Sequence, residues 1–351
     1  MSQSTLNRPI NLSYCSFAPR LMDVRIGQPN VLLKAHGFRV EVSNVTVKAP
    51  RNIAPDEPKI IVIQRMLPTP GEWQKSMKEI LKRGWLVVME VDDYPLDTGL
   101  KVNANKWENS MGWEGFSCCH GVQVSTDVLA DIIEPYNSET KVFGNHLFQV
   151  PPLAKRTDDN VRIFFGALNR KDDWKELLPV FNRIGAKYPN VQFVTLFDRE
   201  FYNAIESPNK SFSDVLEYMQ YQQLMSKCDI AIMPLQDTRF KRCKSDIKFV
   251  EAGGASLAVV ASPTVYENSI RHGETGLIAR SESDWEDMLV SLIENDQMRK
   301  DMGYAARQYV LQERMLIQHI HKRVDWYQSL WDRREDLTAA LIERFPEVAP
   351  D

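Results

Sequence analysis

The sequence has few of the features that mark membrane-spanning or nucleic-acid-binding proteins. No apolar run reaches the roughly 18 residues that a membrane-spanning helix needs. Lys and Arg number 43 against 47 Asp and Glu, so the net charge is −4, whereas bulk nucleic-acid binding requires an excess of cations. The polar residues 1–5 contain no apolar signal core. We therefore expect a cytoplasmic protein without a nucleic-acid partner, and we leave peripheral membrane contact and the oligomeric state open.

Cysteine is also scarce, and its pattern argues against two further classes of protein. The five Cys are odd in number and scattered, unlike the framework of a disulfide-rich secreted domain. The run Cys118-Cys119-His120 lacks the C-x-x-C spacing of zinc sites, and adjacent strand residues point to opposite faces. Buried thiols beside a strand explain this run better than metal ligands do, so we expect no metal.

The first strand-to-helix turn lacks the dinucleotide-binding signature. No G-x-G-x-x-G follows the expected strand at residues 10–15, so a hydride-transfer function is not supported. What the chain does contain is a repeated alternation of apolar runs and amphipathic segments, which is typical of α/β domains. The length of 351 residues suffices for two such domains. Residues 150–160 mix Pro and charge without periodicity, so we predict one domain at residues 1–152 and a second at residues 160–310.

The most informative stretch is residues 244–277. It contains a helical run ending at Gly253-Gly254, followed by the apolar run ASLAVVA, which is typical of a strand buried on both faces. Lys244, Ser245 and Lys248 stand at the start of the helix, where cations and free backbone N–H groups suit phosphate oxygens. Glu251 follows, and an ionised carboxylate can accept hydrogen bonds from the two hydroxyls of a ribose. A diphosphate site beside a diol site indicates a nucleotide.

A second phosphate-type site is expected after the strand at residues 161–165. Gly166 opens a turn that carries Arg170 and Lys171 and leads into a helix expected from Trp174. Helix N-termini with nearby cations bind anions. The alternative is an ordinary strand-to-helix turn with exposed cations, and the residues alone leave it open.

These residues resemble a known family. The segment EAGGASLAVVAS, beginning at Glu251, resembles the "E-A-x-A-x-G-x-P-V-V-A-S" segment of retaining GT-B glycosyltransferases of the family 4 type. The turn from Gly273 to Gly276 looks like that family's "G-x-x-G-L" turn, and FKRCKSDIK, from Phe240 to Lys248, resembles the donor loop of one subgroup. The likeness covers the C-terminal half well and the N-terminal half loosely.

The resemblance implies a fold, a reaction and a site. The GT-B fold consists of two Rossmann-like, doubly wound α/β domains that face each other across a cleft. The N-terminal domain is then the acceptor side and the C-terminal domain binds the nucleotide-sugar, expected to be a UDP- or GDP-sugar, with no other cofactor. The acceptor would be a glycan or glycoconjugate, as in polysaccharide biosynthesis. Because charge grows on the leaving diphosphate, fixed cations such as Arg170 and Lys248 would stabilise the transition state.

The chain also departs from the family pattern. The family's first Glu of its Glu-x7-Glu pair would fall at position 243, which is Cys243, so only the ribose-binding Glu has a counterpart, at Glu251. Two other functions therefore stay open: a GT-B-like protein that binds a nucleotide-sugar or glycan without transfer, and a sugar-nucleotide epimerase. Fold alone does not separate them.

In the N-terminal half, candidates for the acceptor side are fewer. Asp92-Asp93 directly follows the apolar run at residues 85–91, and acidic residues at the carboxyl end of a parallel strand lie where ligands bind. His120 is the best candidate for a general base among the N-terminal histidines, although a lone His is more often structural. We also expect a helix at residues 212–225, a long helix at residues 297–331 whose part 311–331 crosses back to the N-terminal domain, and a charged tail at residues 332–351.

Overall fold

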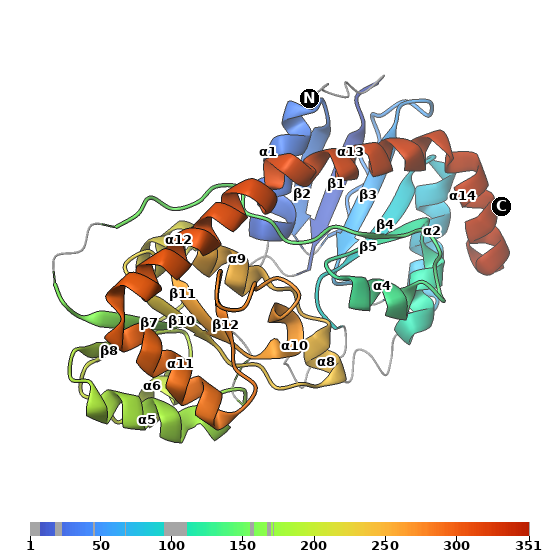
Figure 1. Cartoon of the computed structure of the whole chain (residues 1–351). Helices are drawn as coiled ribbons and strands as arrows, with labels where there is room; N and C mark the ends of the chain where they lie inside the picture. Colours follow the sequence, from blue (N-terminus) through green and yellow to red (C-terminus); the bar gives the residue numbers. More distant parts are fainter. Residues whose placement is uncertain are drawn as a thin grey trace. The chain divides into compact units, whose positions relative to one another are not determined.

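A computed structural model describes residues 8–17, 23–44, 46–66, 68–94, 111–154, 158–166, 170 and 172–350. Contacts within the chain divide it into two units (Figure 1). The first unit comprises Met1–Phe148, Cys243–Ser245 and Leu316–Asp351, and the second comprises Gln149–Arg242 and Asp246–Met315. Within the described residues, none of the helices has both the length and the apolar character needed to cross a membrane.

The first unit is built on a six-stranded sheet in the order β2-β1-β3-β4-β5-β6, and every neighbouring pair is parallel. Its strands are β1 (Asn11–Ser16), β2 (Arg39–Asn44), β3 (Lys59–Gln64), β4 (Leu86–Val91), β5 (Gly121–Val124) and β6 (Thr140–Val142). The central strands β1, β3, β4 and β5 are buried along their whole length, and the mainly apolar sequences of β3 and β4 are typical of such strands.

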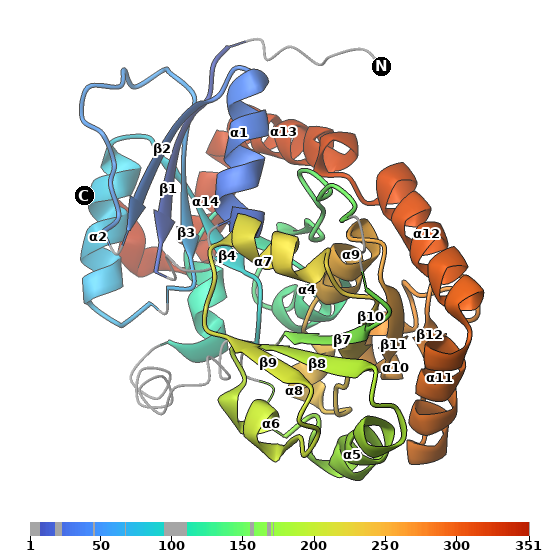
Figure 2. The same ribbon diagram turned by 90° about the vertical axis from the view of Figure 1, so that its left-hand side faces the viewer.

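Helices cover both faces of this sheet. They are η2 (Asp23–Gly27), α1 (Gln28–Ala35), α2 (Glu72–Lys82), η4 (Gly112–Cys118), α4 (Asp127–Ile133), α13 (Leu316–Asp332), α14 (Arg334–Arg344) and η6 (Pro346–Val348). One apolar cluster joins the sheet to α1 and α13, and another joins it to α2, α4 and α14. Figure 2 shows α1 and α2 on opposite sides of β1 and β3.

The end of the chain differs from the expected charged tail. Residues 334–344 form α14, and Leu337, Leu341, Phe345 and Val348 are buried in the core of the first unit. The apolar side chains recur three to four residues apart, which places them on one face of a helix, while the charged residues face solvent. The high charge of this segment reflects an amphipathic helix.

The second unit is also built on a six-stranded parallel sheet, in the order β12-β11-β10-β7-β8-β9. Its strands are β7 (Val161–Gly166), β8 (Val191–Leu196), β9 (Lys210–Ser213), β10 (Ile230–Met233), β11 (Ala258–Ala261) and β12 (Leu277–Ile278). Its helices are η5 (Lys175–Leu177), α5 (Leu178–Lys187), α6 (Arg199–Ala204), α7 (Tyr218–Met225), α8 (Arg239–Arg242), α9 (Ile247–Gly254), α10 (Pro263–Tyr266), α11 (Glu282–Glu294) and α12 (Asp296–Glu313).

Two expected helices have different boundaries in the structure. The helix expected at residues 212–225 begins only at Tyr218, because residues 210–213 form the edge strand β9 beside β8. The long helix expected at residues 297–331 is two helices, α12 and α13, which belong to different units. At the break, Arg314 makes a bidentate ion pair with Asp246, at 2.6 and 2.9 Å.

Gly253 of α9 and Gly303 of α12 serve helix packing. The helical run ends at Gly254 as expected, but neither Gly253 nor Gly254 is in the left-handed conformation, and Ser256 is the residue with positive φ, at 65°. A Cβ on Gly253 would lie 3.3 Å from the Ala306 carbonyl oxygen of α12, and one on Gly303 would lie 2.2 Å from the Ser256 carbonyl oxygen. Glycine at these positions lets α9 and α12 approach closely.

Candidate functional site

The second sheet has a topological switch point at β7. The chain moves from β7 to β8 and β9 on one side, and then returns to β10 and β11 on the other side. In open α/β sheets, ligands bind outside the carboxyl ends of the strands at such a point. Gly166 ends β7, and Leu235 and Gln236 follow the end of β10. Gly166 and Arg170 thus lie at the edge where this fold binds ligands.

A buried carboxylate organises this edge. The side chain of Asp173 is fully buried, and its Oδ1 accepts hydrogen bonds from the Gln236 backbone N–H, at 3.0 Å, and from the Lys241 ammonium. The Arg170 Nη1 lies 3.9 Å from Oδ2, which has no hydrogen-bond partner. Two cations on one carboxylate leave one positive charge uncompensated among these three groups, which favours an anionic ligand.

Lys241 was missed in the sequence analysis. It lies on the short helix α8, and its Nζ also donates to the Gln236 side-chain oxygen at 2.8 Å. Its side chain is only 13% exposed, against 10% for Arg170. In sequence, Arg239, Lys241 and Arg242 look like an exposed cationic turn. Only the ion pair with the buried Asp173 distinguishes Lys241 from its two neighbours.

The buried hydroxyl of Tyr266 lies beside Arg170. Tyr266 lies on α10; burial raises the pKa of its hydroxyl, and the neighbouring Arg170 guanidinium opposes that rise. Gly166 has no room for a side chain, since a Cβ would lie 2.5 Å from the Phe164 ring. Lys171, the other cation expected here, lies outside the described residues.

Glu251 is held by two partners in the same unit. It lies on α9 and is 4% exposed. Its Oε2 accepts a hydrogen bond from the Tyr221 hydroxyl at 2.7 Å, and the Lys248 Nζ lies 3.6 Å from the same oxygen. Lys248 also donates to the Tyr221 oxygen at 3.3 Å. Burial, followed by the negative charge of Glu251, raises the pKa of Tyr221 well above its usual value, so this hydroxyl stays a donor.

Lys244 and Ser245 do not belong to the same unit as Lys248 and Glu251. Residues Cys243–Ser245 pack with the first unit, where the Lys244 Nζ lies 2.9 Å from the Asp93 Oδ2. The Ser245 hydroxyl oxygen accepts a hydrogen bond from the Asn145 side-chain amide at 2.7 Å. The first two residues of the expected phosphate site are thus engaged by Asp93 and Asn145 in this structure, and their role toward phosphate stays a prediction.

Cys243 anchors this three-residue segment. It is fully buried in an apolar cluster of the first unit, and its carbonyl accepts a hydrogen bond from the Thr126 hydroxyl at 3.2 Å. The position where the resembling family has a carboxylate is thus a core position in this chain.

The first sheet has its own switch point between β1 and β3, and polar side chains follow its carboxyl ends. Arg65, after β3, makes a bidentate pair with Asp92, after β4, at 2.5 and 2.9 Å. Burial raises the pKa of Asp92, but the charge and hydrogen bonds of Arg65 outweigh it and lower the pKa overall. Asp92 and Asp93 follow β4 at this edge and are both ion-paired, and their role in binding stays a prediction.

His120 lies at the opposite edge of the first sheet and does not have the geometry of a general base. It is 1% exposed and precedes β5, at the amino end of the strand. Its Nδ1 accepts from the Val87 backbone N–H at 2.9 Å, and its Nε2 lies 3.3 Å from the Thr338 hydroxyl. Burial lowers the pKa of His120 to about 3. A neutral imidazole with both nitrogens engaged is structural, and this corrects the expected catalytic role.

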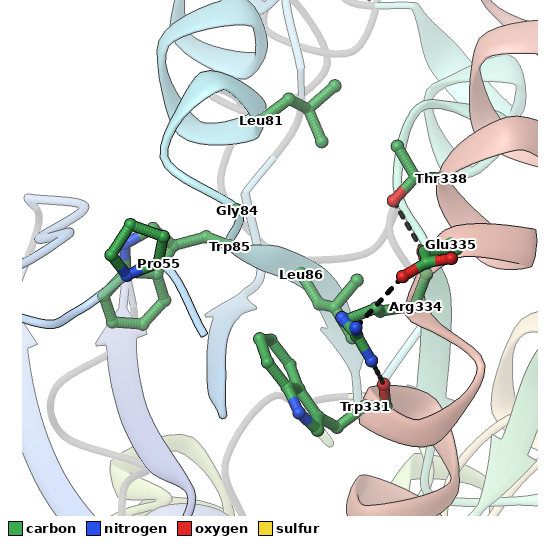
Figure 3. Close-up of a pocket in the computed structure, with 9 residues that line it drawn as sticks. All are labelled: Pro55, Leu81, Gly84, Trp85, Leu86, Trp331, Arg334, Glu335 and Thr338. Atoms are coloured by element: carbon green, nitrogen blue, oxygen red, sulfur yellow. Dashed lines mark hydrogen bonds and ion pairs between the residues drawn. The ribbon is translucent and has the colours of Figure 1, made fainter. Parts of the chain in front are cut away.

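A cavity of about 350 Å³ opens near His120, also at the amino edge of the first sheet (Figure 3). Its lining residues are Pro55, Leu81, Gly84, Trp85, Leu86, Trp331, Arg334, Glu335 and Thr338. Arg334 pairs with Glu335 at 3.0 Å and lies over the Trp331 ring. None of the site residues expected from the sequence lines this cavity.

The cysteines have the properties of core residues. Burial raises the pKa of Cys118 to about 11 and that of Cys119 to about 12, so both are protonated thiols at neutral pH. In the part of the chain that the structure describes, no three His, Cys, Asp or Glu side chains gather in a way that could hold a metal ion.

Comparison with known proteins gives one family match. Residues 159–295 match the model of the family described as Glycosyl transferases group 1. This range contains Arg170, Asp173, Lys241 and Glu251. No curated protein matches the sequence significantly.

Solved structures with a similar fold include three from bacteria. S. aureus TarM, in complex with UDP and α-GlcNAc-glycerol, superposes with a TM-score of 0.57 at 13% identity; the match covers 77% of this chain and 55% of the TarM chain. Anabaena HepE, in complex with UDP and glucose, superposes with a TM-score of 0.59 at 15% identity; the match covers 91% of this chain and 99% of the HepE chain. Sucrose-phosphate synthase from Thermosynechococcus elongatus superposes with a TM-score of 0.64 at 10% identity; the match covers 92% of this chain and 99% of the synthase chain.

The match thus spans little more than half of the TarM chain and nearly all of the other two chains. Identities this low show a shared fold. The two six-stranded parallel sheets and their helices match GT-B glycosyltransferase structures. The chain therefore has the GT-B fold, and its second unit carries the sequence pattern of the Glycosyl transferases group 1 family.

Proposed function

We propose that the protein is a glycosyltransferase that moves a sugar, a hexose, from a nucleotide-diphosphate donor to a glycan, lipid-linked or protein acceptor. One observation carries the proposal: Arg170 and Lys241 flank the buried Asp173 at the switch point of the unit that matches the Glycosyl transferases group 1 family. Two cations at this edge suit a diphosphate better than a neutral ligand.

In this reaction the bond between the sugar and the diphosphate breaks, and negative charge grows on the leaving diphosphate. Arg170 and Lys241 are held in place by Asp173 before the ligand arrives, so they stabilise that charge without reorganisation. Cations of the protein then do the work that a metal ion does in other transferases. Lys171, outside the described residues, is a further candidate for the same role.

Glu251 is the residue that we assign to the ribose. Tyr221 and Lys248 hold its Oε2, and an ionised carboxylate accepts hydrogen bonds from neighbouring hydroxyls. TarM and HepE were both solved with UDP, which supports UDP as the first donor nucleotide to test, with GDP next. Retention of configuration is proposed from the family resemblance.

The test is to incubate the purified protein with UDP-, GDP- and dTDP-sugars and to measure free nucleotide. Transferases hydrolyse their donor slowly when no acceptor is present, so we expect release of UDP or GDP. An altered sugar on an intact nucleotide would instead identify an epimerase. Lack of both binding and turnover with all three nucleotides would refute the proposal.

One observation favours a second candidate function. Cys243 is buried in the core, at the position where the resembling family has the Glu that contacts the donor sugar. A protein without that carboxylate could bind a nucleotide-sugar without transferring the sugar. Calorimetric binding of UDP-glucose with no release of UDP would support this candidate over the transferase.

A further inference from the structure

Among the sheet edges that the structure describes, the strand β2 is the longest. It has six residues, whereas the other edge strands, β6, β9 and β12, have three, four and two. It pairs with β1 and ends the first sheet (Figure 2). An edge strand presents a row of unpaired N–H and C=O groups, and natural proteins usually keep such strands short. An edge as long as the central strands therefore needs an explanation.

The backbone groups of alternate residues in β2 point away from the sheet. The Arg39 N–H donates to the Ile10 carbonyl, beside β1, at 2.9 Å, so residues 39, 41 and 43 direct their backbone groups to β1. The N–H and C=O groups of Val40 and Val42 then point outward. No backbone hydrogen bond in the described part of the chain uses these four groups. They are available to form a ladder with a further strand.

The side chains of β2 form one apolar row and one charged row. Val40 and Val42 stand on the face that α1 covers, and Val42 is 45% exposed there. Arg39 and Glu41, of opposite charge, stand on the other face. Arg39 is exposed and pairs with Glu57 at 3.2 Å, and its five N–H donors can hold a second carboxylate. Glu41 is exposed and makes no ion pair within the described residues.

A second copy of β2 can extend this edge if the two strands run antiparallel around a two-fold axis. Three registers are centred on the middle of the strand, at Val40, Glu41 or Val42. The register centred on Glu41 places two carboxylates directly opposite each other, which is destabilising. The register centred on Val42 places Val40 opposite Asn44 and Glu41 opposite Ser43. Neither the exposed charge nor the apolar row gains a complementary partner in these two registers.

The register centred on Val40 matches both rows. The two copies of Val40 face each other and exchange a pair of backbone hydrogen bonds. Arg39 of each copy lies opposite Glu41 of the second copy, on the charged face. Val42 of each copy lies opposite Phe38 of the second copy, on the apolar face. Cross-strand pairs of opposite charge, and of aromatic with β-branched side chains, each stabilise a sheet.

We propose that β2 is the interface for a second copy of this chain, paired antiparallel in the register centred on Val40. The two first sheets then form one continuous sheet. The contact is only one strand wide, so the dimer is weak and depends on protein concentration. It uses none of the residues assigned to the nucleotide, Arg170, Lys241 and Glu251, so it holds or fails independently of the proposed transfer reaction.

The test is analytical ultracentrifugation of the full chain from about 1 µM to about 0.1 mM, a range that suits a weak interface. The observed mass is compared with the 40.5 kDa of one chain. Arg39→Glu and Glu41→Arg are examined alone and as an equimolar mixture. Val40→Pro removes the central outward N–H, at an edge position that tolerates proline. Lys141→Glu, an exposed charge reversal on the edge strand β6 of the same sheet, is the matched control.

We expect the parent mass to rise toward twice that of one chain. Each charge variant should weaken dimerisation about tenfold or more, because like charges then face each other twice across the two-fold axis. The mixture of Arg39→Glu and Glu41→Arg should restore the dimer, because one strand then carries only carboxylates and the other only guanidinium groups. Val40→Pro should stay monomeric, and Lys141→Glu should dimerise like the parent.

Three results would overturn the proposal. The first is a mass of one chain over the whole concentration range. The second is a dimer that none of the β2 variants weakens, because its interface then lies on another surface. The third is a dimer that both charge variants weaken but their mixture does not restore, because the register centred on Val40 is then wrong. The melting temperature of each variant shows whether it is folded, and the two surface charge variants decide the question if Val40→Pro is not.

Discussion

Replacing His120 gives the sharpest test of how the structure assigns roles in the first unit. Its Nδ1 accepts from the Val87 N–H, so the ring proton is on Nε2 and points to the Thr338 hydroxyl. The Thr338 hydroxyl donates in turn to the Arg334 carbonyl at 2.7 Å. Protonating Nδ1 would place a second donor against the Val87 N–H and a positive charge in the core.

The consequence is a pH-dependent stability with a defined sign. An unfolded His takes up a proton below about pH 6.5, whereas burial holds the pKa of the folded His120 at about 3. Between these two values the unfolded state binds more protons, so stability is fully present above pH 6.5 and falls as the pH falls. The slope is about 1.4 kcal/mol per pH unit, which amounts to about 2.7 kcal/mol at pH 4.5.

The assay compares the parent with His120→Asn, whose amide oxygen can still accept from the Val87 N–H but does not titrate. Denaturant unfolding followed by tryptophan fluorescence, at several pH values from about 7.5 to 4.5, gives the free energy of unfolding of each protein. We expect the parent to lose stability relative to the variant by the amount above, since the contributions of all other groups cancel in the difference. A difference that does not change with pH would refute the buried neutral imidazole. Loss of sugar transfer in His120→Asn at unchanged stability would restore the catalytic role.

Three further predictions concern the second unit. Glu251→Gln should weaken UDP-sugar binding about tenfold in calorimetry, because one charged hydrogen-bond acceptor is lost, and a 2′,3′-dideoxy nucleotide should bind the parent as weakly as it binds the variant. Equal binding of ribo- and dideoxynucleotide by the parent would exclude Glu251 as the ribose ligand. Tyr221→Phe should raise the KM for the donor with little change in melting temperature, since it frees the Glu251 carboxylate to rotate, and a drop in melting temperature alone would mean a purely structural role. Lys241→Met should weaken UDP binding about tenfold or more while uridine binds as before, because a charge-assisted contact to phosphate is worth about 1.5–3 kcal/mol. Lys244→Met serves as the comparison, because Lys244 is ion-paired with Asp93.

The sequence by itself determined the sheet architecture of both units. The apolar run at residues 85–91 is typical of a strand covered on both faces and contains β4, and the strand expected at residues 161–165 is β7. Glycine and Pro then separate strands from helices, so α/β alternation follows from local composition. The segment around Glu251 was likewise found from the sequence, because a carboxylate inside an apolar helical run is unusual.

Tertiary structure decided the partners of the charged residues and the limits of the last helices. Lys241 and Lys244 look alike in sequence, yet one is tied to Asp173 in the second unit and the other to Asp93 in the first. His120 looked like a base and is a core residue, because only packing shows that Val87 and Thr338 engage both of its nitrogens. Charge and periodicity act over a few neighbouring residues, whereas the position of an ammonium, a carboxylate or an imidazole depends on strands and helices more than 60 residues away along the chain. At the helix break the same holds for Arg314, whose bidentate partner Asp246 lies 68 residues earlier in the chain.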